Sequence, residues 1–549
     1  MTRSYAARPW LVIVGCLGLM LSTVSIGVAD DQDVVSTTTV DDPLRPFQWN
    51  LDRIRAPEAW EITRGSPEVT IAIVDTGVDT SHRDLADAFW TDPVTGVNGF
   101  DHIHQTSTIY LGATSDWHGT AIAGVAAARA DDGYGMAGVA PEVSLMVHRI
   151  YGSTSSSEPP TQTSYSVAAE AVRHSAAAGA DVILLTWGGV VPNDELFAAI
   201  RDVGVPVVAA AGNDGQDLSS DPSTPRYPAM YRLPNLITVA ATDRDNQILE
   251  DGFVASNFGK RHVDIAAPGD GVISIVPGGE HTLYDGTSFA APHVAGALAL
   301  GRAIAPGVPD NELVGMLVTA ARRSASLRDK VTSGGVLDVA AFLRVVERPV
   351  CVATIPPADF PDLDRSSLHV GNIDCIAWYG VTQGTGDGFV ASRTITRGET
   401  ATLLVRALEA AGYELPADPT ATFDDIEATT HEASIRILAE VGLVSGVGGG
   451  TFEPHRPVTR GQMASMVIGV VEEVTDLQLP TDRDWFDDIE RSAHADAIVK
   501  AREAGITLGG AEPRSFMPSR DMTRGQMASF LARMLDVVGR QGVTVEQLS

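Results

Sequence analysis

The feature that most constrains the fold is an alternation of short apolar runs with helical segments rich in small residues. Valine, isoleucine and leucine dominate the runs, which have strand length. The runs are Val69–Val74, Val143–His148, Val182–Leu185, Val205–Ala211, Ile237–Ala241 and Val263–Ala266, and the helical segments are Ala121–Ala128, Val167–Ala178, Asp194–Val203 and the one after Ser288. Strands that alternate with helices predict an α/β fold with a parallel β-sheet flanked by helices.

The segment that begins at Gly286-Thr287-Ser288 is predicted to be a helix buried on nearly all sides, because small and apolar residues continue to Ala303. The positive end of this helix would present the Ser288 hydroxyl beside free backbone N–H groups. Gly286 leaves room for close approach of a substrate. A serine at a helix start is more often only an N-cap, so residues elsewhere must decide its role.

Two further motifs supply partners for a nucleophilic serine. Asp75-Thr76-Gly77 follows the first apolar run, and His118-Gly119-Thr120 opens a segment of small residues. A serine nucleophile needs a base, and the base needs an anion that fixes its tautomer. The order aspartate, histidine, serine is that of subtilisin. Over roughly residues 48–346 the chain therefore resembles the subtilisin-like (subtilase) serine proteases.

The resemblance implies a role for each matching residue. Asp75 would orient the base, His118 would act as general base and then acid, and Ser288 would be the nucleophile. Asn213 would donate to the oxyanion, although asparagine before Asp-Gly could equally form a turn. The segment expected to pair with substrate backbone comprises Thr186, Trp187, Gly188 and Gly189, with Gly212 also near the substrate. Trp187 would either narrow the first specificity pocket or simply pack.

Two departures from the family pattern stand in the sequence. Ala121 occupies the place where many relatives have a second histidine, and few residues separate the predicted signal from Trp49, which leaves little room for a folding prodomain. The usual autoprocessing route is therefore in doubt. The leading function is a secreted serine endopeptidase acting on proteins or peptides. The alternatives are a catalytically silent scaffold for wall binding and another serine hydrolase, such as an esterase.

No cofactor is expected for catalysis, but a structural Ca²⁺ is. Asp84 and Asp132 fall where subtilases often hold such an ion, and Asp132 lies in the glycine-rich acidic stretch Asp131–Gly135. Carboxylate and carbonyl oxygens from loops are the ligands that Ca²⁺ prefers. A solvated acidic turn is the alternative.

Charge and the amino terminus point to an exported protein. The formal net charge of −31 argues against a nucleic-acid partner. Residues 1–29 resemble a signal peptide, with Arg3 and Arg8 before an apolar run, and a retained membrane anchor is the alternative. Removal of the signal leaves Cys351 and Cys375, which would form one disulfide or remain unpaired.

The remaining boundaries follow from composition and from an internal repeat. We expect an acidic lead at 30–46, a peptidase domain at 47–347 and a linker at 348–359. A threefold repeat follows at 360–415, 423–473 and 486–538. Each copy contains Phe-x-Asp and a Thr-Arg-Gly-Glu/Gln motif, which begin at Phe360, Phe423 and Phe486 and at Thr396, Thr459 and Thr523. Each Thr-x-x-Glu/Gln predicts a helix that starts with a capping box.

The repeats resemble S-layer homology (SLH) modules, which fasten exported proteins to bacterial cell-wall polymers. The pattern departs from the usual Thr-Arg-Ala-Glu by a glycine at the third place. The resemblance implies a mainly α-helical domain and a location at the cell wall or cell surface of a bacterium, with no integral membrane partner. Arg397, Arg460 and Arg524 would contact an anionic polymer or else form local salt bridges.

Overall fold

The computed structural model describes residues 40–548 apart from 152–163, 221–224, 251, 253, 348–349, 352–354, 366, 368, 387, 482–484, 508 and 510–514. The predicted signal at 1–29 and most of the acidic lead at 30–46 lie outside the described residues, as does part of the linker at 348–359. Within the described residues, no helix is both long and apolar enough to span a membrane.

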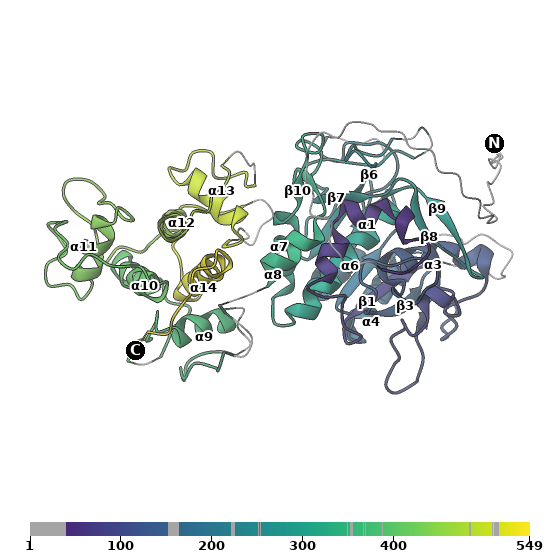
Figure 1. Ribbon diagram of the computed structural model, residues 1–549, viewed down its shortest axis with the longest axis horizontal. Helices are drawn as coiled ribbons and strands as arrows, with labels where there is room; N and C mark the ends of the chain where they lie inside the picture. The colour runs from purple at the N-terminus through teal and green to yellow at the C-terminus, as the bar shows by residue number, and fades with distance from the viewer. Residues whose placement is uncertain are drawn as a thin grey trace, which may run out of the picture. The chain divides into compact units, whose positions relative to one another are not determined.

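A nine-stranded sheet forms the centre of the amino-terminal part, in the order β10-β11-β7-β6-β5-β4-β1-β3-β2 (Figure 1). Its strand pairs are parallel except for β10 with β11. The strands are β1 (Thr70–Asp75), β2 (Gly99–Asp101), β3 (Ser144–Arg149), β4 (Val182–Leu185), β5 (Val207–Ala210), β6 (Leu236–Thr242), β7 (Ile265–Pro268), β10 (Arg322–Arg323) and β11 (Gly335–Val336). The predicted parallel α/β architecture is confirmed.

Helices cover both faces of this sheet. On one face Ile71 and Ile73 of β1 join the apolar cluster that includes α3 and α6, and on the other Ala72 and Val74 join α4 and α5. The helices are α1 (Trp49–Arg53), α2 (Ala56–Trp60), α3 (Ala113–Ala127), α4 (Tyr165–Ala177), α5 (Asp194–Asp202), α6 (Thr287–Ile304), α7 (Asp310–Thr319) and α8 (Val339–Val346), with 3₁₀ turns at Arg45–Phe47 and Arg83–Leu85. Successive side chains of β1 therefore pack alternately into two separate cores, one on each face of the sheet.

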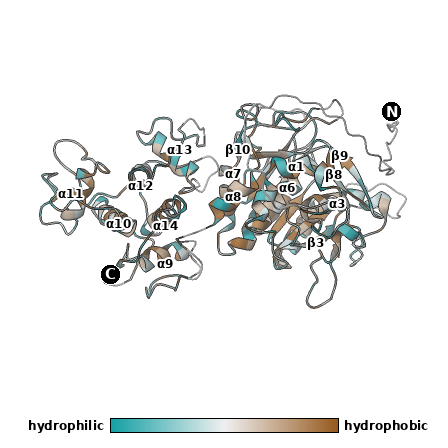
Figure 2. Ribbon diagram, in the orientation of Figure 1, coloured by the Kyte–Doolittle hydropathy of each residue, from teal (hydrophilic) through white to brown (hydrophobic). Residues whose placement is uncertain are grey.

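Helix α6 is buried along nearly its whole length, as the run of small residues predicts. In Figure 2 the apolar colouring concentrates in the sheet and in the helices packed on it. A two-stranded hairpin, β8 (Val272–Val276) and β9 (Glu280–Tyr284), precedes α6. The Gly286 N–H then donates to the Gly269 carbonyl at 2.8 Å, which fixes where α6 begins.

The carboxy-terminal repeats are helical. Their helices are α9 (Val370–Trp378), α10 (Arg397–Ala410), α11 (Glu432–Glu440), α12 (Arg460–Val474), α13 (Ala495–Glu503) and α14 (Arg524–Arg540). The three predicted capping boxes are present, each with both reciprocal hydrogen bonds. Just before these boxes, Ile395 N–H donates to the Met522 carbonyl, Met522 to Val458 and Val458 to Ile395, each at 3.0 Å. This closed ring ties the three repeats into one unit.

The repeated arginines lie between neighbouring repeats. Arg397, Arg460 and Arg524 are 4–6% exposed, and each donates from Nε to the carbonyl of a phenylalanine in another repeat. The acceptors are Phe452, Phe516 and Phe389, whose rings lie 4.4, 4.7 and 4.8 Å from the guanidinium carbons. The contacts run cyclically from each repeat to the next. The Nε partners are thus backbone carbonyls, with a phenylalanine ring beside each guanidinium. Of the local salt bridges expected from sequence as one alternative, Arg524 forms a long one, 3.8 Å from Glu399.

The glycine of each Thr-Arg-Gly motif has a packing reason. A Cβ on Gly398, Gly461 or Gly525 would approach a histidine ring carbon to 2.8–3.0 Å. The rings belong to His431, His494 and His369, which precede α11, α13 and α9. Alanine, the usual residue of the family motif, would therefore crowd these rings.

A disulfide joins Cys351 to Cys375 of α9, with the two Cα atoms 5.3 Å apart. The Cys351 N–H also donates to Asp536 Oδ1 of α14 at 2.8 Å. These two contacts attach the chain just after α8 to the first and last helices of the repeat unit.

Candidate active site

Asp75 and His118 form a hydrogen-bonded pair at the carboxyl edge of the sheet. Asp75 is the last residue of β1, and His118 lies on α3 just beyond Asp116, where the helix is kinked. The Nδ1 atom of His118 lies 2.8 Å from Asp75 Oδ1, so Nδ1–H donates and Nε2 is left free to accept a proton. Asp75 is 1% exposed, while the His118 side chain is 20% exposed, which leaves the base accessible from one side.

The two groups shift each other's pKa values. Burial alone would lower the pKa of His118, but the charge and hydrogen bond of Asp75 outweigh it and raise this pKa above its ordinary value of 6.5. Burial would raise the pKa of Asp75, yet the His118 charge and hydrogen bonds from His118, Thr186 and Thr76 hold it below its usual range. Asp75 is therefore ionised and His118 is a strengthened base.

Ser288 lies in the first turn of α6, as the motif predicts. Its hydroxyl donates to the carbonyl of Thr186 at 3.0 Å, just beyond the end of β4. The ring of Phe289, the next residue, is 6.0 Å from the ring of His118. The hydrogen bond between a nucleophile and its base often tightens only when substrate binds, so the bond to Thr186 is compatible with a later pairing of Ser288 and His118.

Asn213 is held in one orientation beside the start of α6. Its Oδ1 accepts from the Thr287 N–H at 2.9 Å and from the Thr287 hydroxyl at 3.0 Å. These two donors identify the acceptor end of the amide, so Nδ2 is the free donor. A Cβ at Gly286 would lie 3.1 Å from Nδ2, which explains the glycine there. The amide donor therefore sits next to the Ser288 segment, as an oxyanion site requires.

Comparisons with known proteins assign two regions of the chain to known families. Residues 66–338 match the Subtilase family, Peptidase S8, and residues 422–464 match the S-layer homology domain. Thermitase of Thermoactinomyces vulgaris is 38% identical over 256 residues, which make up 46% of this chain and 81% of thermitase. The chain belongs to the subtilase family.

A second curated relative leads to the same class. The major intracellular serine protease of Bacillus subtilis is 35% identical over 254 residues, 45% of this chain and 72% of that protein. A solved protease of Pseudoalteromonas arctica aligns over 56% of this chain and 100% of its own, at 26% identity and a TM-score of 0.48. This subtilase is thus a subtilisin-like serine endopeptidase that carries an SLH domain.

Two residues of the segment expected to pair with substrate, Trp187 and Gly189, contact other parts of the domain in this subtilase. Trp187 is 9% exposed, and its indole N–H donates to the Val74 carbonyl at 2.8 Å, so it packs beneath the sheet edge. Gly189 exchanges two backbone hydrogen bonds with Tyr227, at 2.9 and 2.8 Å, and a Cβ on it would collide with the Tyr165 hydroxyl. Trp187 therefore packs, which is one of the two outcomes expected for it from sequence.

Gly212 is constrained from both sides. Its φ is +96°, a left-handed conformation, and a Cβ there would lie 2.6 Å from Asn257 Nδ2 and 2.9 Å from Arg226 Cγ. Its N–H donates to the Thr287 hydroxyl at 3.1 Å. Glycine is needed here to bring the end of β5 against the start of α6.

A buried ion-pair network behind the site was not found from sequence. Arg149, fully buried at the end of β3, donates from Nε to Asp116 Oδ1 at 3.2 Å and from Nη1 to Asp101 Oδ2 at 2.9 Å. Asp116 also accepts the N–H groups of Leu111 and Gly112. Asp116 stands two residues before His118. The network therefore fixes where the part of α3 that carries His118 begins. A lone arginine at a strand end gives no sequence signal for such a role.

The two residues expected to bind Ca²⁺ lie in different surroundings. Asp84 is fully buried; its Oδ2 accepts from His281 Nε2 at 2.6 Å and from the Met136 N–H at 3.2 Å, while Oδ1 has no hydrogen-bond partner among the described residues. Asp132 is exposed and accepts from the Tyr134 N–H at 2.8 Å. Within the described part of the chain, neither belongs to a group of three acidic, histidine or cysteine side chains whose ligand atoms lie close enough together to hold one metal ion.

Proposed function

We propose that the chain is an exported endopeptidase that hydrolyses peptide bonds through an acyl-enzyme formed on Ser288. The observation that carries the proposal is the hydrogen-bonded pair of Asp75 and His118 at the same sheet edge as the Ser288 turn. In this assignment Asp75 fixes the tautomer of the base. His118 Nε2 takes the Ser288 proton as the serine oxygen attacks the substrate carbonyl.

The later steps use the same groups. Negative charge on the carbonyl oxygen is stabilised by Asn213 Nδ2 and by the free N–H of Ser288 at the start of α6. His118 then gives its proton to the departing amine, and the carbonyl remains bonded to Ser288. Water, activated by His118, hydrolyses this ester and restores the serine. The backbone at Thr186, Gly188 and Gly212 would hold the peptide as an added strand beside the site.

The alternative is a catalytically silent scaffold. The observation that favours it is the Ser288 hydroxyl, which donates to the Thr186 carbonyl. Labelling with a fluorophosphonate separates the two, because only an activated serine reacts. We expect one covalent adduct per chain, and an unlabelled folded protein would support the scaffold. A panel of matched peptide and ester substrates then distinguishes an endopeptidase from an esterase.

The SLH repeats are proposed to hold the enzyme at the bacterial cell wall. The support is the match of residues 422–464 to that domain, together with the closed ring that joins the three repeats. Full-length protein should sediment with isolated cell-wall sacculi, whereas a chain truncated after Val346 should stay in the supernatant. If both stay in the supernatant, the repeats are not a wall anchor.

A structural Ca²⁺ is proposed at Asp84 and the loop that contains Asp132. The buried, unpartnered Asp84 Oδ1 fits such an ion, since Ca²⁺ takes carboxylate oxygens together with loop carbonyls. Gly135, where a Cβ would lie 2.1 Å from an Asp84 oxygen, keeps this space open. A bound ion would stabilise the fold by mass action. The melting temperature should fall on chelation and recover with millimolar Ca²⁺; an unchanged value would remove the site.

A further inference from the structure

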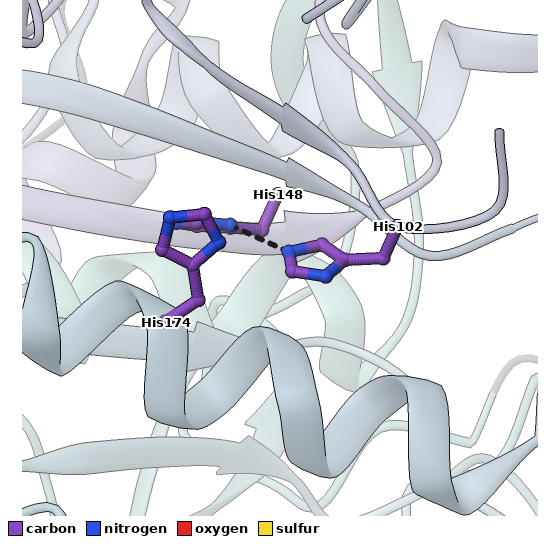
Figure 3. A group of neighbouring side chains, drawn as sticks. All are labelled: His102, His148 and His174. Atoms are coloured by element: carbon purple, nitrogen blue, oxygen red, sulfur yellow. Dashed lines mark hydrogen bonds between the residues drawn. The ribbon is translucent and has the colours of Figure 1, made fainter. Parts of the chain in front are cut away.

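Three histidines outside the proposed active site converge from three different elements (Figure 3). His102 directly follows β2, His148 lies on β3 and His174 lies on α4. The parallel register of β2 and β3 pairs Phe100 with His148, which brings His102 close to that strand position. His148 lies on the same face of the sheet as Met146 and Ile150, which pack with α4. The fold itself therefore brings the three rings together.

The ring nitrogens have the spacing of a metal-ligand set. One nitrogen from each ring lies within 4.8 Å of the other two, and His102 Nε2 is 2.9 Å from His148 Nδ1. Ligands around a tetrahedral Zn²⁺, at bond lengths of about 2.0–2.1 Å, stand about 3.3 Å apart. The two buried rings need to separate by only a few tenths of an ångström. His174 occupies an exposed position on its helix, and its ring centroid lies 4.9 Å from that of His148 and 5.4 Å from that of His102.

Packing alone explains the cluster poorly. His102 and His148 are 3% and 1% exposed, and their shared hydrogen bond uses one nitrogen of each ring. Of the other two nitrogens, His148 Nε2 is buried with no hydrogen-bond partner among the described residues, and His102 Nδ1 has only the Glu170 carboxylate, 3.6 Å away.

A carboxylate stands where the outer shell of such a site would need one. Glu170 Oε1 lies 3.6 Å from His102 Nδ1, the nitrogen opposite the one that faces His148. Metal-binding histidines usually donate their second N–H to a carboxylate, which fixes the ring and strengthens the ligand. Glu170 and His174 are four residues apart on α4 and share one face of it.

We propose that His102, His148 and His174 form a binding site for a divalent transition-metal ion of the Zn²⁺ class, with Glu170 positioning His102. Three imidazoles suit Zn²⁺ and its neighbours, whereas Ca²⁺ requires oxygen ligands. The fourth position opens towards solvent, because Glu170 and His174 are exposed. A bound ion would link α4 to the β2–β3 edge of the sheet. This site is chemically distinct from the carboxylate site at Asp84.

The test uses the full-length chain, stripped with a chelator and then held in millimolar Ca²⁺ so that any calcium site is filled. Zn²⁺ is titrated by calorimetry, and Co²⁺ is added as a spectroscopic probe. We expect one Zn²⁺ per chain, a higher melting temperature with Zn²⁺, and the visible absorption of nitrogen-bound Co²⁺ in low coordination.

The variants locate the ion. His174→Gln alters an exposed side chain and should weaken Zn²⁺ binding at least tenfold, and Glu170→Gln should weaken it about tenfold. His455→Gln changes an exposed histidine in the repeat region and should leave binding unchanged. Circular dichroism of each variant checks that it is folded. No Zn²⁺ binding by the wild-type chain, or equal binding by the wild type and His174→Gln, would overturn the proposal.

Discussion

The Thr186 hydroxyl donates to Asp75 Oδ2 at 2.5 Å, while the other oxygen of that carboxylate accepts from His118. The carbonyl of the same threonine accepts from Ser288. Thr186 therefore contacts both ends of the proposed catalytic set, through its side chain at Asp75 and through its backbone at Ser288.

Thr186→Val should lower kcat/KM by about tenfold or more. The substitution leaves one buried oxygen of Asp75 without a donor, at a cost of about 1–3 kcal/mol. It also removes a hydrogen bond that keeps the pKa of Asp75 low. Thr186→Ser keeps the hydroxyl and is the matched control, which should retain most activity on a peptide amide substrate. Equal activity of the valine and serine variants would show that this hydrogen bond is unimportant.

The acid limb of the pH–rate profile should lie above pH 6.5. Catalysis needs neutral His118, and Asp75 raises the pKa of that histidine, so activity falls as the pH drops through this raised value. Asp75→Asn should move the limb to lower pH and reduce kcat by roughly 10⁴, because the anion that holds the tautomer is lost. The measurement is kcat/KM from pH 5 to 9 for both proteins. If the acid limb of Asp75→Asn lay at the same pH as that of the wild type, Asp75 would not be the group that raises the pKa of the base.

Asn213→Ala should lower kcat by about 10²–10³ with little change in KM, since the amide donor acts on charge that develops in the transition state. The same change also removes the acceptor of the Thr287 N–H. Asn213→Asp keeps that acceptor, replaces the donor by a carboxylate oxygen and adds a negative charge beside the proposed oxyanion position. Both variants should therefore be impaired in steady-state assays on a peptide amide. An aspartate variant with the wild-type kcat would assign Asn213 a structural role instead.

In the repeat region, Gly461→Ala should destabilise the fold by about 1–3 kcal/mol through overpacking. Its Cβ would lie 3.0 Å from His494 Cδ2 and 3.1 Å from the Pro518 carbonyl oxygen. Gly371 of α9 stands at the same helical position, where a Cβ would have no neighbour within 4 Å. Gly371→Ala should be neutral or stabilising by up to about 1 kcal/mol. The measurement is the free energy of unfolding of both variants in chemical denaturant. Equal values for the two variants would contradict the packing argument.

Much of the proposed active site could be predicted because its residues lie within local motifs at strand and helix ends. Asp75 closes a strand and Ser288 opens a helix, so a parallel sheet brings them to one edge. Arg149 could not be predicted, because its partners Asp101 and Asp116 come from distant segments that meet only after the sheet has formed. The local sequence around Trp187 does not distinguish a residue that lines a pocket from one that packs in the core.

In the repeat unit, too, local features could be predicted from the sequence and contacts between distant segments could not. The capping boxes at Thr396, Thr459 and Thr523 are local in sequence, and all three were predicted. The contacts of Arg397, Arg460 and Arg524 cross from one repeat to another. Sequence period alone shows that these arginines are equivalent, but it does not show that they face carbonyls and rings of a neighbouring repeat.

The most direct test of the central assignment is the peptidase activity of Ser288→Ala on casein, beside the wild-type chain. The change removes one hydroxyl from the first turn of α6 and should leave the circular dichroism spectrum unaltered. We expect the wild type to release peptides and the folded variant to release none above background. Casein cleavage by Ser288→Ala at the wild-type rate would contradict the assignment of Ser288 as the nucleophile.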